Sequence, residues 1–171
     1  MDFIVEKEFE YEGYKCVVIF GKLGHRCGYV GVDKTHPLYK VNCGDYLDIL
    51  KKDIRDREVS GAIPFLLACL DTDEHIRAEA YFQVHGGLTY SGGGDNSEYP
   101  IKSDLWWLGF DCGHYGDGSD LELAIKVFPE RKEYYERGMF FDGEIRTLEY
   151  VENECKQLVT QLEEYKKLAE V

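Results

Sequence analysis

The sequence predicts an α+β fold in which an antiparallel sheet has a long carboxyl-terminal helix packed on it. Strand-like runs separated by glycine-rich turns fill residues 1–118, and residues 119–171 carry apolar side chains at helical spacing. With 171 residues, 44% of them hydrophobic, the chain is long enough for one core and long for two. We therefore expect a single domain over 1–171, with strands, loops and one short helix in 1–118 and mainly helices in 119–171.

The first predicted strand carries a row of carboxylates. Glutamates occupy every second position at Glu6, Glu8, Glu10 and Glu12. A period of two places these side chains on one face, and Glu12 with Gly13 predicts a turn into a second strand over 14–20. Such a row suits a basic partner, and a solvated sheet edge protected from aggregation explains it equally well.

The middle of the chain is predicted to alternate strands, loops and one surface helix. A third strand is expected over 27–32. A short helix is expected over 45–59, where the apolar residues Tyr46, Leu47, Leu50 and Ile54 lie near helical spacing. Two short strands on either side of a glycine break, over 77–84 and 88–93, and a buried strand over 103–113 complete the sheet.

The last third is predicted to be helical. Ser119 and Glu122 have the spacing of a capping box, so a helix is expected to begin there and to end before Pro129. From Thr147 a heptad seam follows, formed by Leu148, Val151, Cys155, Leu158, Leu162 and Tyr165. Packing of this helix across the sheet is expected in a monomer, and the alternative is a homodimer through the terminal helix.

Two glycine-rich motifs hold most of the chemically active side chains. Residues 84–93 and 106–120 supply the candidate ligand-binding residues His85, Gly86, Gly87, Thr89, Tyr90, Ser91, Asp111 and Asp117. A serine hydrolase is disfavoured because the chain has no G-x-S-x-G motif. A phosphate cradle is disfavoured because the glycine loops carry aspartates and no lysine or arginine.

The same motifs suggest a metal site. His25 with Cys27, and Cys112 with His114, each stand two residues apart, so on neighbouring strands the four side chains could surround a zinc ion. His85 with Asp111 and Asp117 could form a more open site. The alternative is structural, because cysteines are often buried without chemistry and histidines beside glycine often bond only to the backbone.

The charge balance favours a basic protein partner. The chain has 33 acidic and 20 basic residues, a net charge of −13, which disfavours direct nucleic-acid binding. Candidate partner-binding residues are the glutamate row, the helix glutamates Glu149, Glu152 and Glu163, and Trp107, one of two adjacent tryptophans that face opposite sides of a strand. No membrane span or signal peptide is expected, which predicts a cytoplasmic protein.

Four segments, in this order, resemble a family of small phage and prophage proteins, mostly without assigned function: "GHRCGYVGV", "HPLY", "VHGGLTYSG" and "WWLGFDCGHYGD". The similarity covers about residues 13–120, and both ends of the chain depart from it. By analogy of class it implies an inhibitor of host defence, such as an anti-CRISPR protein, acting in the cytoplasm of an infected or lysogenic bacterium. The partner would be a basic, nucleic-acid-handling protein such as a CRISPR-associated nuclease.

Two hypotheses follow from the sequence. The first is this acidic inhibitor, favoured because no complete catalytic constellation is present and a protein of this kind needs no cofactor. The second is a small metal-dependent enzyme or ligand-binding protein with a site around His85, Asp111, Cys112 and His114, for which zinc is the expected ion.

Overall fold

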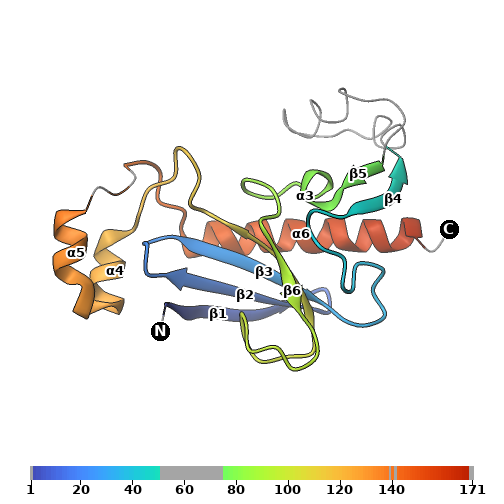
Figure 1. Cartoon of the computed structure of the whole chain (residues 1–171), viewed down its shortest axis with the longest axis horizontal. Coiled ribbons are helices and arrows are strands. Elements are labelled where there is room, and N and C mark those ends of the chain that lie inside the picture. Colours follow the sequence, from blue (N-terminus) through green and yellow to red (C-terminus); the bar gives the residue numbers. More distant parts are fainter. Residues whose placement is uncertain (1, 51–74, 139, 141, 170–171) are drawn as a thin grey trace.

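The computed structural model describes residues 2–50, 75–138, 140 and 142–169 of the chain. Its main sheet has five antiparallel strands in the order β1-β2-β3-β7-β6. These are β1 (Phe3–Tyr11), β2 (Tyr14–Gly21), β3 (Arg26–Val32), β6 (Tyr90–Gly93) and β7 (Trp106–Asp111). A long helix, α6 (Leu148–Ala169), crosses one face of this sheet (Figure 1), which confirms the predicted α+β architecture.

The packing of α6 explains its sequence pattern. Val151, Cys155, Leu158 and Leu162 of the predicted seam are all fully buried, in one core with residues of β2, β3 and β7. The backbone of β3 lies close beneath the helix at Gly28, where a Cβ atom would stand 2.7 Å from Sγ of Cys155. The seam is therefore used inside this chain, so a homodimer through the terminal helix would need another helix face.

The β1–β2 hairpin forms as predicted, but its glutamates do not share one face. A bulge between Val5 and Lys7 shifts the register of β1 against β2. The bulge turns the Glu6 side chain to Arg26 of β3, while Lys7 reaches Glu152 of α6. Since an extra residue reverses the alternation of a strand, the row of carboxylates is interrupted after Glu6.

Two predicted elements of the middle region are wrong. Residues 46–50 form strand β4 (Tyr46–Leu50) rather than the start of a helix, and the rest of the predicted helix lies outside the described residues. Strand β4 pairs with β5 (His75–Arg77), and a single helical turn, α3 (Ala78–Tyr81), replaces most of the strand expected over 77–84. Tyr46 is exposed and Leu47 is buried, as in the two-residue alternation of a strand. The spacing of the apolar residues alone did not distinguish a strand from a helix here.

The predicted helix before Pro129 is present with a different cap. Helix α4 (Leu121–Val127) is capped by Asp120, whose carboxylate accepts a hydrogen bond from the Leu123 amide. It is followed by a 3₁₀ turn, η1 (Pro129–Arg131), and by α5 (Lys132–Arg137). Ser119 lies one residue too early to cap the helix, and its hydroxyl contacts Nε2 of His25 instead.

Trp107 was expected at a partner surface, and the structure corrects this. Its side chain is 0% exposed and packs with Val17, Ile19 and Tyr29 in a second core on the sheet face opposite α6. The indole N–H donates to the Ser103 hydroxyl at 3.0 Å. A fully buried side chain offers no surface to a partner.

Three further observations bear on the sequence predictions. Cysteines 16, 27, 43, 112 and 155 are free thiols. No helix within the described ranges combines the length and apolarity needed to cross a membrane. The largest core draws residues from both Tyr14 of β2 and Tyr165 of α6, so the strand-rich and helical parts of the chain pack together.

Arg26 joins the sheet to the helical region. It is 7% exposed and binds both carboxylate oxygens of Glu6, at 2.7 and 2.8 Å. Its other nitrogen donates to the carbonyl of Arg146, just before α6, and lies 3.5 Å from Asp120. One guanidinium thus connects β1, β3, the cap of α4 and the approach to α6.

Replacing Arg26 with methionine should lower the free energy of unfolding by about 3 kcal/mol, because it leaves the mostly buried carboxylate of Glu6 without its partner. Urea denaturation measures the change. Lys22→Met, which breaks the exposed Lys22–Asp2 pair, is the control and should cost less than about 1 kcal/mol. Equal losses in the two variants would contradict the structural importance of Arg26.

Candidate metal centre

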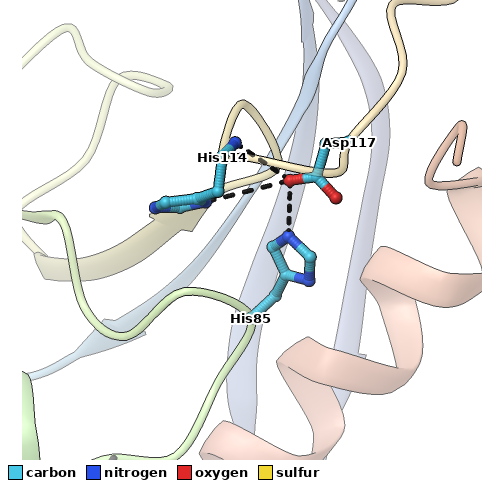
Figure 2. Close-up of side chains that lie close together, drawn as sticks. All are labelled: His85, His114 and Asp117. Atoms are coloured by element: carbon cyan, nitrogen blue, oxygen red, sulfur yellow. Dashed lines mark hydrogen bonds and ion pairs between the residues drawn. The ribbon is translucent and has the colours of Figure 1, made fainter. Parts of the chain in front are cut away.

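Two histidines and one aspartate meet near the amino end of α6. His85 lies in the loop between α3 and β6, and His114 and Asp117 lie in the loop after β7. One potential ligand atom from each lies within 4.8 Å of the other two. Figure 2 shows both histidines beside the same oxygen of Asp117.

Asp117 is the centre of this cluster. The residue is 2% exposed, and its Oδ2 accepts from Nε2 of His85 at 2.7 Å and from the amide of His114 at 3.0 Å. Its Oδ1 accepts from Nε of Arg146 at 2.9 Å. Burial raises the pKa of Asp117, but the hydrogen bonds from Arg146, His85 and His114 outweigh it and hold the pKa below the ordinary 3.8. The carboxylate is therefore ionised at neutral pH.

His85 is held at three points. Besides Asp117, its Nδ1 contacts the hydroxyl of Tyr150 at 2.9 Å, and its amide donates to Glu154 at 2.7 Å. Burial raises the pKa of Tyr150, so its hydroxyl stays protonated and can either donate to or accept from the imidazole. This partner suits both tautomers of His85, including the one that presents a bare Nε2 to a metal ion.

His114 is the most accessible member of the cluster. Its side chain is 36% exposed, and its ring centroid lies 5.6 Å from that of His85. Nδ1 stands 3.9 Å from Asp117 and 3.8 Å from Asp111, too far for hydrogen bonds, and has no hydrogen-bond partner within the described part of the chain. A ring nitrogen beside an ionised carboxylate, without a hydrogen bond of its own, is suited to bind a metal ion.

Gly86 and Gly87 shape the loop that carries His85. Both adopt positive φ, +69° and +84°. A Cβ atom on Gly86 would stand 2.5 Å from Nε2 of His114, so no other residue fits without moving that ring. The glycine pair thus lets the His85 loop approach the loop after β7.

The surroundings of the cluster come from the segment that leads into α6, which the sequence analysis did not assign to the site. Arg146 contacts Asp117, pairs with Glu144 at 2.7 Å and lies 5.0 Å from the ring of Tyr150. Tyr150 and Glu154 stand one helical turn apart on α6, so one face of its first turns reaches His85. The i, i+4 spacing of Tyr150 and Glu154 beside the apolar seam was the sequence feature that could have placed these two residues at the site.

The structure brings together only some of the predicted ligands. His85 and Asp117 meet as expected, but Asp111 accepts from the Thr89 hydroxyl and the Gly113 amide instead. Cys27 faces the second core whereas Cys112 is buried beneath α6, on the other side of the sheet.

The predicted zinc site of His25, Cys27, Cys112 and His114 is therefore not formed. The burial of Cys27 raises the pKa of its thiol to about 11, and the pKa of the Cys112 thiol is also raised by burial. Metals bind the thiolate, so both cysteines are poor ligands here.

Two other predicted ligand-binding residues have structural roles. The ring of Tyr90 packs edge-on against Tyr29 and Tyr99 in the second core. The Ser91 hydroxyl accepts from the amide of Cys43 at 2.9 Å. Neither belongs to the cluster around Asp117.

Most predicted partner-binding glutamates contact groups of the chain itself. Glu6 binds Arg26, Glu152 accepts from Lys7 at 2.8 Å, and Glu163 accepts from the Tyr14 hydroxyl at 2.5 Å. Glu8 lies 3.2 Å from Lys15, across the hairpin. Glu10, Glu12 and Glu149 are exposed.

Comparisons of the chain with family models, with curated proteins and with solved structures found no match.

Gly86→Ala should displace His114 and lower the free energy of unfolding by about 1–3 kcal/mol more than Gly13→Ala does. Gly13 is the matched control, because it also has positive φ (+82°) but a Cβ there meets nothing within 4 Å. Both variants carry the backbone strain, and only the first has the clash. Urea denaturation and the imidazole NMR signals of His114 are the measurements. Equal losses, with unchanged His114 signals, would contradict the close packing of Gly86 on this ring.

Proposed function

We propose that this protein binds a divalent transition metal ion through His85, His114 and Asp117 and is a small metal-dependent enzyme. The convergence of two imidazoles and one buried, ionised carboxylate within 4.8 Å carries the proposal. Two histidines and a carboxylate form a recurring ligand set for zinc and iron(II), and they leave coordination positions open for water or substrate. Such an ion acts as a Lewis acid on a bound substrate.

The ligand types narrow the choice of ion. Imidazole nitrogen with a single carboxylate favours zinc, iron(II), nickel(II) or copper(II), with cobalt(II) as a substitute of similar affinity. Calcium and magnesium prefer sites built from oxygen atoms, and copper(I) prefers sulfur. The buried thiols of Cys27 and Cys112 are not among the ligands, which supports a site of nitrogen and oxygen donors.

The contacts around the ligands also support a metal site. Metal-binding histidines usually donate a hydrogen bond from their second ring N–H to an oxygen. Metal-binding carboxylates usually accept hydrogen bonds from neighbouring groups. The hydroxyl of Tyr150 is the oxygen beside the second ring nitrogen of His85, and Arg146 donates a hydrogen bond to the carboxylate of Asp117. These partners hold the ligands in place before an ion arrives, which reduces the ordering that binding must impose.

The inhibitor hypothesis has less support from this geometry. Glu6, Glu152 and Glu163 contact groups of the same chain, and Trp107 is buried. The carboxylates of these glutamates and the indole of Trp107 therefore make contacts within the fold.

The purified protein should bind about one equivalent of zinc or cobalt(II), measured by elemental analysis and by the visible absorption of bound cobalt. His114→Ala should weaken binding by more than about 100-fold, beyond the 10- to 100-fold typical of losing an outer contact. Asp117→Asn should have a similar effect, and Asp95→Asn, the same change at an exposed carboxylate, should have none. No saturable binding by the folded protein, or unchanged binding by His114→Ala, would refute the metal centre.

Tyr150→Phe should weaken metal binding by about tenfold, because the metal-bound form of His85 loses the acceptor for its Nδ1 proton. Cobalt titration of the wild type and the variant measures the ratio of the dissociation constants. Tyr134→Phe removes the hydroxyl of a half-exposed tyrosine on α5, away from the cluster, and should leave the affinity unchanged. If both variants bind cobalt as the wild type does, Tyr150 does not position His85.

A further inference from the structure

We propose that the outer edge of β1 binds an extended, basic segment of a partner protein, which pairs with β1 as an added strand of the sheet. β1 is the first strand in the order β1-β2-β3-β7-β6, so it has a neighbouring strand on one side only. No backbone hydrogen bond from elsewhere in the described chain reaches residues 3–11. Figure 1 shows β1 along the outer side of the sheet. The proposal does not depend on the metal cluster, to which β1 contributes no residue.

The register of the hairpin identifies the backbone groups that are free on this edge. Residues 12–13 form a two-residue turn with positive φ, +48° and +82°, between the paired residues Tyr11 and Tyr14. Such a turn closes on a pair that exchanges both backbone hydrogen bonds, and bonded and non-bonded pairs then alternate along the hairpin. Every second residue back from Tyr11 therefore bonds to β2. The N–H and C=O groups of Glu8 and Glu10 point to the open edge instead.

The side chains of these two residues favour a basic partner. Glu8 and Glu10 are exposed and lie on one face of β1. Together with the exposed Glu12 in the turn, they outnumber the ammonium group of Lys15, which lies 3.2 Å from Glu8. On an added strand, the residues directly opposite Glu8 and Glu10 have their side chains on this same face. Lysine or arginine at those two positions would balance the excess negative charge.

The other face of β1 defines the residue between the two basic ones. Phe9 and Tyr11 are partly buried and pack against the main core. The intervening side chain of the partner would lie beside these rings, where a β-branched or aromatic residue fits. The partner segment therefore alternates basic and apolar residues. A second copy of this chain is a poor partner, because antiparallel pairing of β1 with itself about Phe9 places Glu8 opposite Glu10 of the other copy.

The test uses peptides that differ only in which edge of the strand is blocked. The parent peptide, acetyl-Lys-Val-Lys-Val-Lys-Val-Lys amide, is titrated into the full chain labelled with nitrogen-15. When its lysines lie opposite Glu8 and Glu10, the backbone N–H groups of the lysines face β1 and those of the valines face solvent. We expect saturable binding of the parent and of a peptide methylated on two valine backbone nitrogens. Methylation of two lysine backbone nitrogens should weaken binding by at least about tenfold, because it removes hydrogen bonds to β1 at unchanged charge.

Hydrogen exchange locates the added strand on the protein. In the free protein, the amides of Glu8 and Glu10 should exchange quickly with solvent, and those of Phe9 and Tyr11 slowly. At a concentration of parent peptide about ten times its dissociation constant, the exchange of the Glu8 and Glu10 amides should slow by about tenfold, since only the free protein exposes them. Binding without this protection would overturn the added strand.

Variants test the contribution of charge. Glu8→Gln combined with Glu10→Gln should weaken binding of the parent peptide by about fivefold or more, as expected for the loss of two exposed ion pairs. Glu122→Gln combined with Glu149→Gln removes the same charge from exposed positions outside β1 and should leave the affinity unchanged. Equal effects of the two double variants would overturn the basic partner.

Three further outcomes would overturn the proposal. Equal binding of the two methylated peptides would reduce the interaction to charge attraction without strand pairing. No saturable binding of the parent peptide would mean that the glutamates only protect an open edge from aggregation. Dimerisation of the chain alone, with protection of the same two amides, would assign the edge to a second copy.

Discussion

The buried carboxylate of Asp117 connects three segments that are distant in sequence. It accepts hydrogen bonds from His85 before β6, from the amide of His114 after β7 and from Arg146 before α6. Burying a charge is costly, and the three donors offset that cost while keeping the group ionised. The site and the start of the terminal helix are thus fixed by the same group, so the geometry of the cluster and the docking of α6 depend on each other.

Helix α6 positions polar side chains at both of its ends. Its buried seam fixes the rotation of the helix on the sheet, and that rotation directs Tyr150 and Glu154 to His85 at one end. At the other end the same rotation places Glu163 and Lys166 beside the β1–β2 hairpin. Gly28 allows the helix to approach β3 closely enough for both ends to reach their partners. Packing chemistry in the middle of α6 therefore determines the polar contacts at its ends.

The sequence predicted the features that follow from local periodicity and missed those that depend on tertiary contacts. The β1–β2 hairpin and α6 have strong periods of two and of three to four residues, and both are present. The bulge at Glu6 was not predictable because Arg26, the group that binds this glutamate, becomes its neighbour only when β3 joins the sheet. His85 and Asp117 were identified from glycine-rich motifs. Arg146 precedes α6 and Tyr150 lies on its first turn, where the spacing of Tyr150 and Glu154 beside the apolar seam was a much weaker signal. The zinc site predicted from the two histidine–cysteine pairs does not form because Cys27 and Cys112 face opposite sides of the sheet.

The net charge of −13, which argues against nucleic acids, is consistent with cation binding by the cluster around Asp117. Around the Asp117 cluster, the carboxylates of Asp111, Asp117, Glu144 and Glu154 outnumber the guanidinium of Arg146, so the proposed divalent cation would relieve local repulsion. The histidine nitrogens beside Asp117 favour a transition metal over other cations. Acidity alone attracts any cation, and these neutral groups provide the discrimination.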